Sequence, residues 1–283
     1  MKWYDKYLTV FEKPFIDASE ETICSIKSNL SALQSENPVA SVIIIAHNEE
    51  KRLLSCLWSL SDSICKYPIE IIGVNNSSTD RTADVYQSVG LRYFDEERKS
   101  SGYARNRGLY EAKGKYCICI DSDTMYPEKY VEIMIDKLEK PGVVAVCSLW
   151  SYVPSKEFPR FWMSIYEFIR DIHLLMLSFK NPEYCVRGMV FAHVTDLAKQ
   201  YGFRVDLKRG EDGSMTLCLK KHGKVYFVRS RKARAVTSTS TLSSDGSLAN
   251  AFWQRVKGAL KGAKKYFVKK KGVIKDDPSN LIN

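Results

Sequence analysis

The sequence predicts an α/β fold in which helices cover both faces of a mainly parallel, twisted β-sheet. Short apolar runs of strand length alternate with segments whose apolar residues recur at helical spacing. Strands separated by helices in this way pair in parallel, because each connection has to cross over a face of the sheet. A chain of 283 residues, 45% of them hydrophobic, is long enough for one large domain of this kind.

The expected elements follow one another along most of the chain. We expect strands at residues 41–46, 69–74, 91–94, 115–120, 143–149 and 186–192. We expect helices at residues 49–64, from about Asp80, at 102–112, from Pro127, at 161–179 and at 211–222. Ser78 or Thr79 is expected to cap the helix that begins near Asp80. The apolar stripe at 161–179 is interpreted as core packing, and a role in shaping an acceptor site is the alternative.

Composition excludes several classes of protein. Charged residues interrupt the apolar stretches at the N-terminus and around residues 165–179, so we expect neither a signal peptide nor a spanning helix. The eight cysteines include no CxxC pair, which makes a zinc site improbable. Cys117 and Cys119 alternate along an expected strand and therefore share a face. We expect buried, reduced thiols and a cytoplasmic protein.

The net charge of +10 is unevenly distributed. Residues 255–275 hold nine Lys or Arg and no Asp or Glu, and residues 247–271 are expected to form a basic helix. Such a tail suggests an anionic partner, which could be a membrane surface, a nucleic acid or a phosphorylated substrate. A helix face that is merely solvated is an equally good interpretation.

Polar clusters follow three of the expected strands. Ligands of parallel α/β sheets bind beyond the carboxyl ends of the strands, so these clusters mark one candidate site. The first strand is followed by His47, Asn48 and Glu49, the second by Asn75, Asn76 and the segment up to Asp80, and the fourth by Asp121, Ser122 and Asp123. The amides and hydroxyls of residues 75–80 can hydrogen-bond a base and a ribose.

Three groups have residue types suited to chemistry. Asp121 and Asp123 can converge on a magnesium or manganese ion, which completes its coordination shell with substrate phosphates. Arg105 opens an expected helix and could pair with a pyrophosphate. Glu211 and Asp212 either stabilise a helix dipole or supply the base that deprotonates an acceptor hydroxyl.

The motifs together resemble family 2 glycosyltransferases. SVIIIAHNEEKRL is similar to the opening strand and turn of that family, and VNNSSTDRT to its second strand-end motif. GYARNRG and AKGKYCICIDSDT resemble its arginine helix and DxD strand, and RGEDGSM resembles its ED motif. The resemblance covers roughly residues 39–223 with the motifs in the right order.

The resemblance implies a GT-A fold, a nucleotide-diphosphate sugar as donor and inversion of the anomeric centre by a hexosyltransferase-type enzyme. It places His47 and Asn75 in the base pocket with Glu49 nearby, and Asp80 and Arg105 along the nucleotide. It also implies that Asp121 approaches the ribose and the metal, that Asp123 binds the metal, and that Asp212 is the general base. The family usually has tyrosine at His47 and acidic residues at Asn75 and Asn76, so the identity of the base stays open.

The same resemblance suggests how the chain is divided. We expect an N-terminal helical extension at 1–37, a nucleotide-sugar-binding half at 38–125, an acceptor-binding half with the ED motif at 126–240, and a basic helical tail at 241–283. The acceptor would be a saccharide or a lipid-linked compound in polysaccharide or glycoconjugate synthesis. The QxxRW signature of processive members is missing, which favours single additions. The tail could attach the enzyme to the inner face of the membrane.

Two other functions have some support in the sequence. A nucleotidyltransferase also joins an α/β sheet to metal-binding carboxylates, but it would usually have a Gly-rich basic loop where this chain has AHNEEKRL. A non-enzymatic nucleic-acid-binding protein would explain the basic tail, but it would interleave cations with stacking aromatics. The tail has only Tyr266 and Phe267 among its lysines, so no nucleic acid is expected as a partner.

Overall fold

A computed structural model describes residues 2–155 and 158–240, and its main feature is a mixed β-sheet. Within these residues the sheet has seven strands in the order β3-β2-β1-β4-β8-β6-β9. The strands are β1 (Ala40–Ala46), β2 (Ile69–Asn75), β3 (Tyr93–Asp95), β4 (Tyr116–Asp121), β6 (Val143–Ser148), β8 (Phe191–Val194) and β9 (Lys224–Val228).

Strands β1, β2, β3 and β4 are parallel and fully in register. Ala46 pairs with Asn75 and Ile45 pairs with Asp121, so the polar residues after these strands meet at one edge. Strand β8 lies antiparallel between β4 and β6. The expectation of a mainly parallel sheet is therefore confirmed, with β8 as the exception among the seven strands of this sheet.

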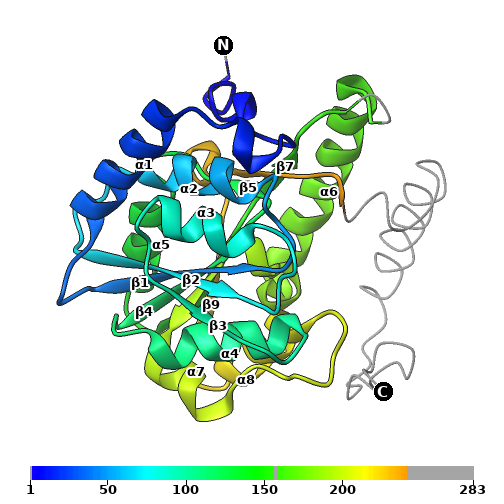
Figure 1. Cartoon of the computed structure of the whole chain (residues 1–283). Coiled ribbons are helices and arrows are strands. Elements are labelled where there is room, and N and C mark those ends of the chain that lie inside the picture. Colours follow the sequence, from blue (N-terminus) through cyan, green and yellow to red (C-terminus); the bar gives the residue numbers. More distant parts are fainter. Residues whose placement is uncertain (1, 156–157, 241–283) are drawn as a thin grey trace.

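Helices cover both faces of the sheet. Figure 1 shows α4, α7 and α8 below the sheet and α1, α2 and α3 above it. The helices are α1 (Glu20–Leu33), α2 (Leu53–Ser61), α3 (Thr82–Ser88), α4 (Ser101–Glu111), α5 (Tyr130–Leu138), α6 (Arg160–Lys180), α7 (Thr195–Tyr201) and α8 (Glu211–Leu219). Short 3₁₀ turns lie at Tyr7–Thr9, Phe15–Asp17, Pro182–Cys185, Gly188–Val190 and Arg231–Ala233.

A second, three-stranded sheet brings the end of the described chain back to the DxD turn. It consists of β5 (Thr124–Met125), β10 (Ala235–Thr237) and β7 (Trp150–Tyr152) in the order β5-β10-β7. Because Thr237 pairs with Thr124, the residues that follow β10 lie beside Asp123. No feature of the sequence had predicted this sheet.

Some local expectations are wrong. Residues 186–192 form a strand only from Phe191, because the 3₁₀ turn at Gly188–Val190 precedes it. Neither Ser78 nor Thr79 caps α3; instead a carboxylate oxygen of Asp80 accepts from the backbone N–H of Thr82 at 3.0 Å. The predicted basic helix of the tail lies outside the described residues.

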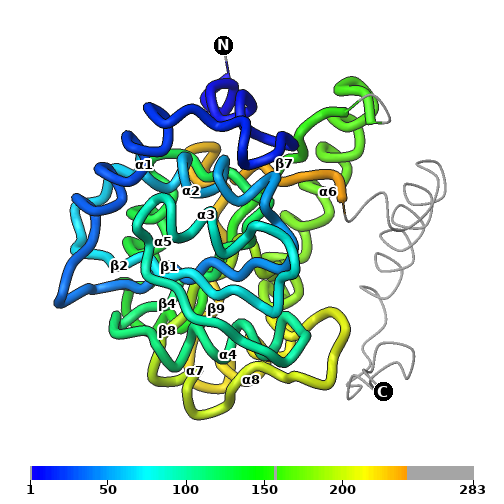
Figure 2. Tube along the Cα trace, in the orientation of Figure 1, coloured from blue at the N-terminus to red at the C-terminus, as the bar shows by residue number. Residues whose placement is uncertain are grey.

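Helix α6 exposes most of the apolar stripe that was expected to pack in the core. Figure 2 shows its trace at the right of the molecule, on the side toward which β1 runs. Its buried residues are Met163, Arg170 and Leu174. The large apolar side chains that face solvent are Phe161, Trp162, Phe168, Ile169, Ile172, Met176 and Phe179, between 38% and 71% exposed. The core-packing interpretation of this stripe is therefore wrong.

The cysteines are free, and five of the eight are buried. Cys117 and Cys119 share a face of β4 as expected, and their sulfurs lie close to the ring of His193 in the sheet core. Cys24, by contrast, is exposed, against the expectation of burial. No helix among the described residues combines the length and apolarity that crossing a bilayer requires.

Helix α4 packs on the sheet through a glycine. A Cβ atom placed on Gly108 would lie 2.1 Å from Cγ2 of Ile43 and 3.3 Å from Cγ2 of Val74. Both neighbours are side chains of buried sheet residues, so they cannot move away cheaply. The absence of a side chain at Gly108 thus sets the distance between α4 and the sheet.

We predict that Gly108→Ala lowers the free energy of unfolding by about 1–3 kcal/mol, because the added methyl overpacks the core. Urea denaturation measures this change. Gly213→Ala is the matched control, since Gly213 also lies in a helix but a Cβ there meets nothing within 4 Å. Equal stability of the two variants would contradict the packing argument.

Candidate active site

The turns after β1 and β2 interlock through backbone and side-chain hydrogen bonds. The Asn48 side-chain oxygen accepts from the Thr79 N–H at 2.8 Å, and Asn48 itself has a positive φ of 54°. In return, Asp80 accepts from the Glu50 N–H at 3.1 Å. Asn and Asp side chains often hold turns in this way. Asn48 and Asp80 therefore build the turns that carry the site.

A cleft of about 500 Å³ lies at this edge of the sheet. Nine of the residues predicted from the sequence line it, whereas Asn48, Asn75 and Asp80 do not. The nine are His47, Glu49, Asn76, Arg105, Asp121, Ser122, Asp123, Glu211 and Asp212. The polar residues that follow the strands thus form part of the wall of one cleft, together with Arg105, Glu211 and Asp212.

Asn75 and Asn76 use their amide groups inside the protein. The Asn75 Nδ2 donates to the carboxylate of Asp95 at 2.7 Å, and the Asn76 Nδ2 donates to two backbone carbonyls. Because a carboxylate only accepts, the amide nitrogen of Asn75 has to face Asp95. Its side-chain oxygen is buried and has no hydrogen-bond partner among the described residues, so Asn75 has an acceptor left over.

Arg105 is the best-buried charge of the site, with 2% of its surface exposed. Its Nη1 donates to the Ile120 carbonyl at 3.0 Å, and its Nη2 donates to the carboxylate of Asp121. Its Nε lies 3.6 Å from Oδ1 of Asp212. These two carboxylates raise the pKa of the Arg105 guanidinium despite burial. Arg105 thus joins the end of β4 to the start of α8.

Asp212 lies in the first turn of α8, which Gly210 initiates at a φ of 99° that favours glycine. The Asp212 residue is 9% exposed, and its Oδ1 has no hydrogen-bond partner among the described residues. Burial raises the pKa of Asp212 to about 7; the Arg105 charge opposes this shift, and Glu211 and Asp121 add to it. A carboxylate in this state can take up a proton near neutral pH.

Gly188 lets the chain pass close to this pair of charges. A Cβ there would lie 2.5 Å from both the Arg105 Nη2 and an Asp212 carboxylate oxygen. Any side chain at this position would push the two functional groups aside. Gly188 therefore contributes to the site by having no side chain.

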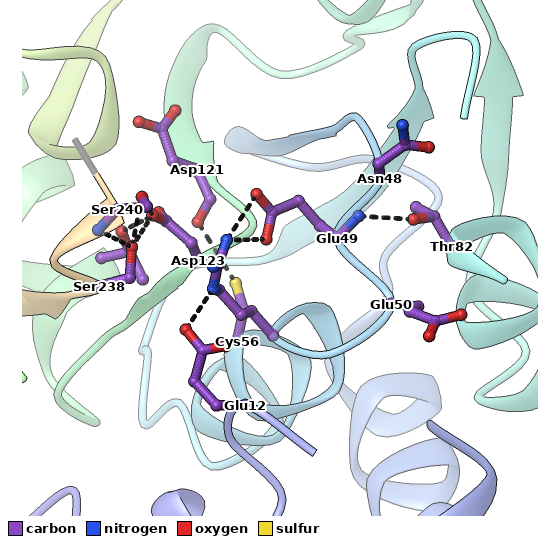
Figure 3. A network of polar contacts seen from close by, with 12 residues as sticks. Glu12, Asn48, Glu49, Glu50, Cys56, Thr82, Asp121, Asp123, Ser238 and Ser240 are labelled. Carbon is purple, nitrogen blue, oxygen red and sulfur yellow. Dashed lines mark hydrogen bonds and ion pairs between the residues drawn. The ribbon is translucent and has the colours of Figure 1, made fainter. Parts of the chain in front are cut away.

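Asp123 is surrounded by hydroxyl groups. Ser238 donates to its Oδ2 at 2.5 Å, Ser240 donates to the same oxygen at 3.3 Å, and Thr124 donates to its Oδ1 at 3.0 Å. Figure 3 shows the carboxylate of Asp121 directed away from that of Asp123. The two aspartates of the DxD motif thus have different protein partners, Arg105 for one and hydroxyls for the other.

Glu49 adds a further carboxylate beside Asp123. Burial and the negative charge of Asp123 raise the pKa of Glu49 to about 7, while Arg52 opposes the shift. Arg52 bridges Glu49 at 3.1 Å and Glu12 at 2.6 Å (Figure 3). The site therefore accumulates negative charge and hard oxygen donors, the environment that magnesium and manganese prefer.

A second cavity, of about 670 Å³, adjoins the cleft. It lies between α6, the start of α8 and the chain around Gly188. Asp212 lines both the cleft and this cavity. The carboxylate with the raised pKa therefore stands where two ligands could meet.

The family model of Glycosyl transferase family 2 matches residues 41–195, more than half of the chain. The chain belongs to this family. Among curated relatives, glycosyltransferase GlyA of Streptococcus pneumoniae is 28% identical over 61% of the chain and 27% of its own length. The 4,4'-diaponeurosporenoate glycosyltransferase of Staphylococcus aureus is 27% identical over 63% of the chain and 49% of its length. The chain thus spans between a quarter and half of these relatives.

A solved structure extends the likeness over nearly the whole of this family 2 chain. Glucosyl-3-phosphoglycerate synthase from Mycobacterium tuberculosis aligns with a TM-score of 0.55 at 18% identity, covering 91% of this chain and 87% of its own. At this identity the likeness concerns the fold, and it confirms the expected GT-A type.

The residues around Asp123 show what sequence reasoning missed in this family 2 protein. Ser238 and Ser240 reach the DxD motif only because β10 pairs with β5, and no role was predicted for Arg52, which bridges Glu49. The alternating Thr and Ser residues at 237–241 were the one available signal.

Proposed function

We propose that this chain transfers a sugar from a nucleotide-diphosphate sugar to an acceptor hydroxyl, with inversion, in polysaccharide or glycoconjugate synthesis. The observation that carries the proposal is the position of Asp212 on the walls of both the DxD cleft and the adjoining cavity. A base that contacts both ligands can deprotonate the acceptor hydroxyl while that hydroxyl attacks the donor sugar. Membership of a glycosyltransferase family supports the same reaction and gives no support to nucleotidyl transfer or nucleic-acid binding.

The donor would lie in the cleft of about 500 Å³ with its diphosphate toward the DxD motif. Asp123 would hold a divalent cation, manganese or magnesium. Asp121 was expected to share this cation, but its carboxylate is directed away from Asp123 and pairs with Arg105. The raised pKa of Glu49 fits this assignment, because a cation would relieve the repulsion between Glu49 and Asp123. The cation would supply positive charge for the departing diphosphate. The mycobacterial structure that shares this fold was solved with Mn²⁺ and UDP-glucose.

Asp212 would act as the general base. As the acceptor oxygen bonds to the anomeric carbon, the bond from that carbon to the diphosphate breaks, and the hydroxyl proton passes to the Asp212 carboxylate. One displacement of this kind inverts the anomeric centre. Arg105 would serve as a positioning residue, because its buried guanidinium holds Asp121 and orients Asp212 from the protein side.

We further propose that the enzyme attaches reversibly to an anionic membrane surface. The nine cations of residues 255–275 would be attracted to anionic lipid, each contributing on the order of 1 kcal/mol near the surface. The exposed apolar face of α6 adds support, since aromatic side chains such as Phe161 and Phe179 favour the boundary between lipid and water.

We predict that a nucleotide diphosphate such as UDP or GDP binds only with a divalent cation and that Asp123→Ala abolishes the cation's effect. Removing the carboxylate leaves the diphosphate charge without its counter-ion. Calorimetric titration with manganese and with a chelator measures both effects. Asp136→Ala is the control, because Asp136 pairs with Lys66 on another part of the surface. Affinity that is unchanged by chelator and by Asp123→Ala would exclude the metal assignment.

We predict that Asp212→Asn lowers the transfer rate by about 10²–10⁴-fold and leaves nucleotide binding nearly intact, because the amide keeps the shape and loses the base. In the wild type, transfer should slow as pH falls through about 7, where Asp212 becomes protonated. Initial rates measured against pH show this decrease at low pH. Glu211→Gln is the control, and its rate should show the same decrease. If Asp212→Asn keeps the wild-type rate, Asp212 is not the general base and Glu211 becomes the candidate.

We predict that the full chain sediments with phosphatidylglycerol vesicles at low salt and stays in the supernatant with phosphatidylcholine vesicles. Binding should weaken as salt rises, because surface charges are screened. A chain cut after Asn250 should lose binding, and Phe168→Ser should weaken it, since Phe168 is 67% exposed. If the full-length protein stays in the supernatant with anionic vesicles at low salt, membrane attachment is refuted.

A further inference from the structure

The cavity beside Asp212 has an unusual balance of charge. Its lining includes three arginines and a histidine, namely Arg170, Arg187, Arg209 and His173, against one carboxylate, Asp212. Asp171, outside this lining, pairs with Arg170, and the lowered pKa of His173 favours its neutral form. Arg187 is therefore a lining cation that can face an anionic ligand.

Arg187 is the least compensated of these cations. Its side chain is exposed, and the one hydrogen bond that it donates within the described residues goes to the carbonyl of the preceding Val186, at 2.5 Å. No carboxylate of the described residues forms an ion pair with it. The pKa of His173 is lowered by burial and also by the positive charge of Arg187, as expected for a cation that faces the same cavity.

Arg170 differs from Arg187 and has a structural role. It forms an ion pair with Asp171 at 2.8 Å, and its guanidinium lies 4.4 Å from the Trp150 ring centre. Packing explains a buried arginine of this kind. Arg187 also lies over the Trp150 ring, at a longer distance of 5.9 Å from its centre, but it has no ion-pair partner among the described residues. An exposed contact of this kind contributes little to stability and leaves the guanidinium able to bind a ligand.

Two buried donors in the cavity wall lack acceptors. The Nη1 of Arg170 and the Nε1 of Trp150 have no hydrogen-bond partner among the described residues, although these residues are only 9% and 4% exposed. Leaving a buried donor unpaired costs about 1–3 kcal/mol, so such atoms in a cavity wall point to a ligand that accepts hydrogen bonds. Phosphate oxygens accept and do not donate when ionised.

We infer that this cavity binds an acceptor that carries a phosphate group next to its reactive hydroxyl, with Arg187 holding the phosphate and Asp212 facing the hydroxyl. The inference rests on the proposed function and specifies its acceptor. Arg187 is suited to the task because its planar guanidinium can hold two phosphate oxygens at once. The aromatic rings of the cavity, those of Trp150 and Tyr184, would contact the carbon skeleton.

The phosphate could belong to a soluble ester or to a lipid head group. Helix α6 bears on this choice, because Ile169, His173 and Leu177 line the cavity while Phe168 and Ile172 of the same helix face solvent. The cavity wall and the exposed apolar face are thus two sides of one helix. Both sources share the chemistry that Arg187 would recognise, and the experiment separates them.

Calorimetry with saturating UDP and manganese, which block the donor cleft, tests the inference with sn-glycerol 3-phosphate and glycerol as probes. We expect glycerol 3-phosphate to bind at least about tenfold more tightly than glycerol, since a charge-assisted hydrogen bond is worth about that much. Arg187→Ala should remove most of this preference and Arg187→Lys should restore part of it. Arg229→Ala, an exposed arginine that lies over Phe179 and outside the cavity lining, should bind as the wild type does.

Dihexanoyl phosphatidylglycerol, used below its micelle concentration, identifies the source of the phosphate. If this lipid binds more tightly than glycerol 3-phosphate, the phosphate belongs to a lipid head group. If it binds more weakly, the phosphate belongs to a soluble ester. Either result agrees with the inference. Equal affinities for glycerol and glycerol 3-phosphate, or an Arg187→Ala variant that keeps the preference, would overturn it. UDP binding is measured first in each variant, so failure of the donor site shows separately from failure of the acceptor assignment.

Discussion

The buried guanidinium of Arg105 is the constraint on which the site depends. Burying a charge costs several kcal/mol unless nearby groups compensate it, and the compensation here comes from the Ile120 carbonyl, Asp121 and Asp212. The arginine can make these contacts only because Gly108 allows α4 to approach the sheet closely. The end of β4 and the start of α8 are thereby fixed relative to each other. Removing the cation would leave two carboxylates repelling each other in a partly buried site.

The same contacts set the chemistry of Asp212. Burial alone would favour the protonated carboxyl strongly, and the charge of Arg105 limits the shift to a pKa of about 7. A base with this pKa is ionised often enough to act and holds a proton well enough to accept one. Gly188 completes the arrangement, because a side chain there would displace both charges. The position and the proton affinity of Asp212, the proposed base, therefore have a common origin in its ion pair with Arg105.

The sequence predicted the parts of the protein that local patterns encode. Apolar runs predicted the strands, and the polar residues after them predicted the cleft, including Asp121 and Asp123. The hydroxyls of Ser238 and Ser240 could not be predicted, because pairing between β10 and β5 brings together segments more than a hundred residues apart in the sequence. A strand at 186–192 was predicted and forms from Phe191, but its antiparallel direction was not, because a short apolar run does not specify direction.

Helix α6 shows the limit of periodicity in another way. A stripe at helical spacing indicates that one face is apolar, but it does not indicate what covers that face. Here the described protein leaves Phe161, Phe168 and Phe179 more than 60% exposed. Exposed apolar clusters of this kind often mark a contact site for a partner or a membrane. Because α6 also lines the proposed acceptor cavity, a membrane that covered its exposed face would contact the same helix that forms the cavity wall.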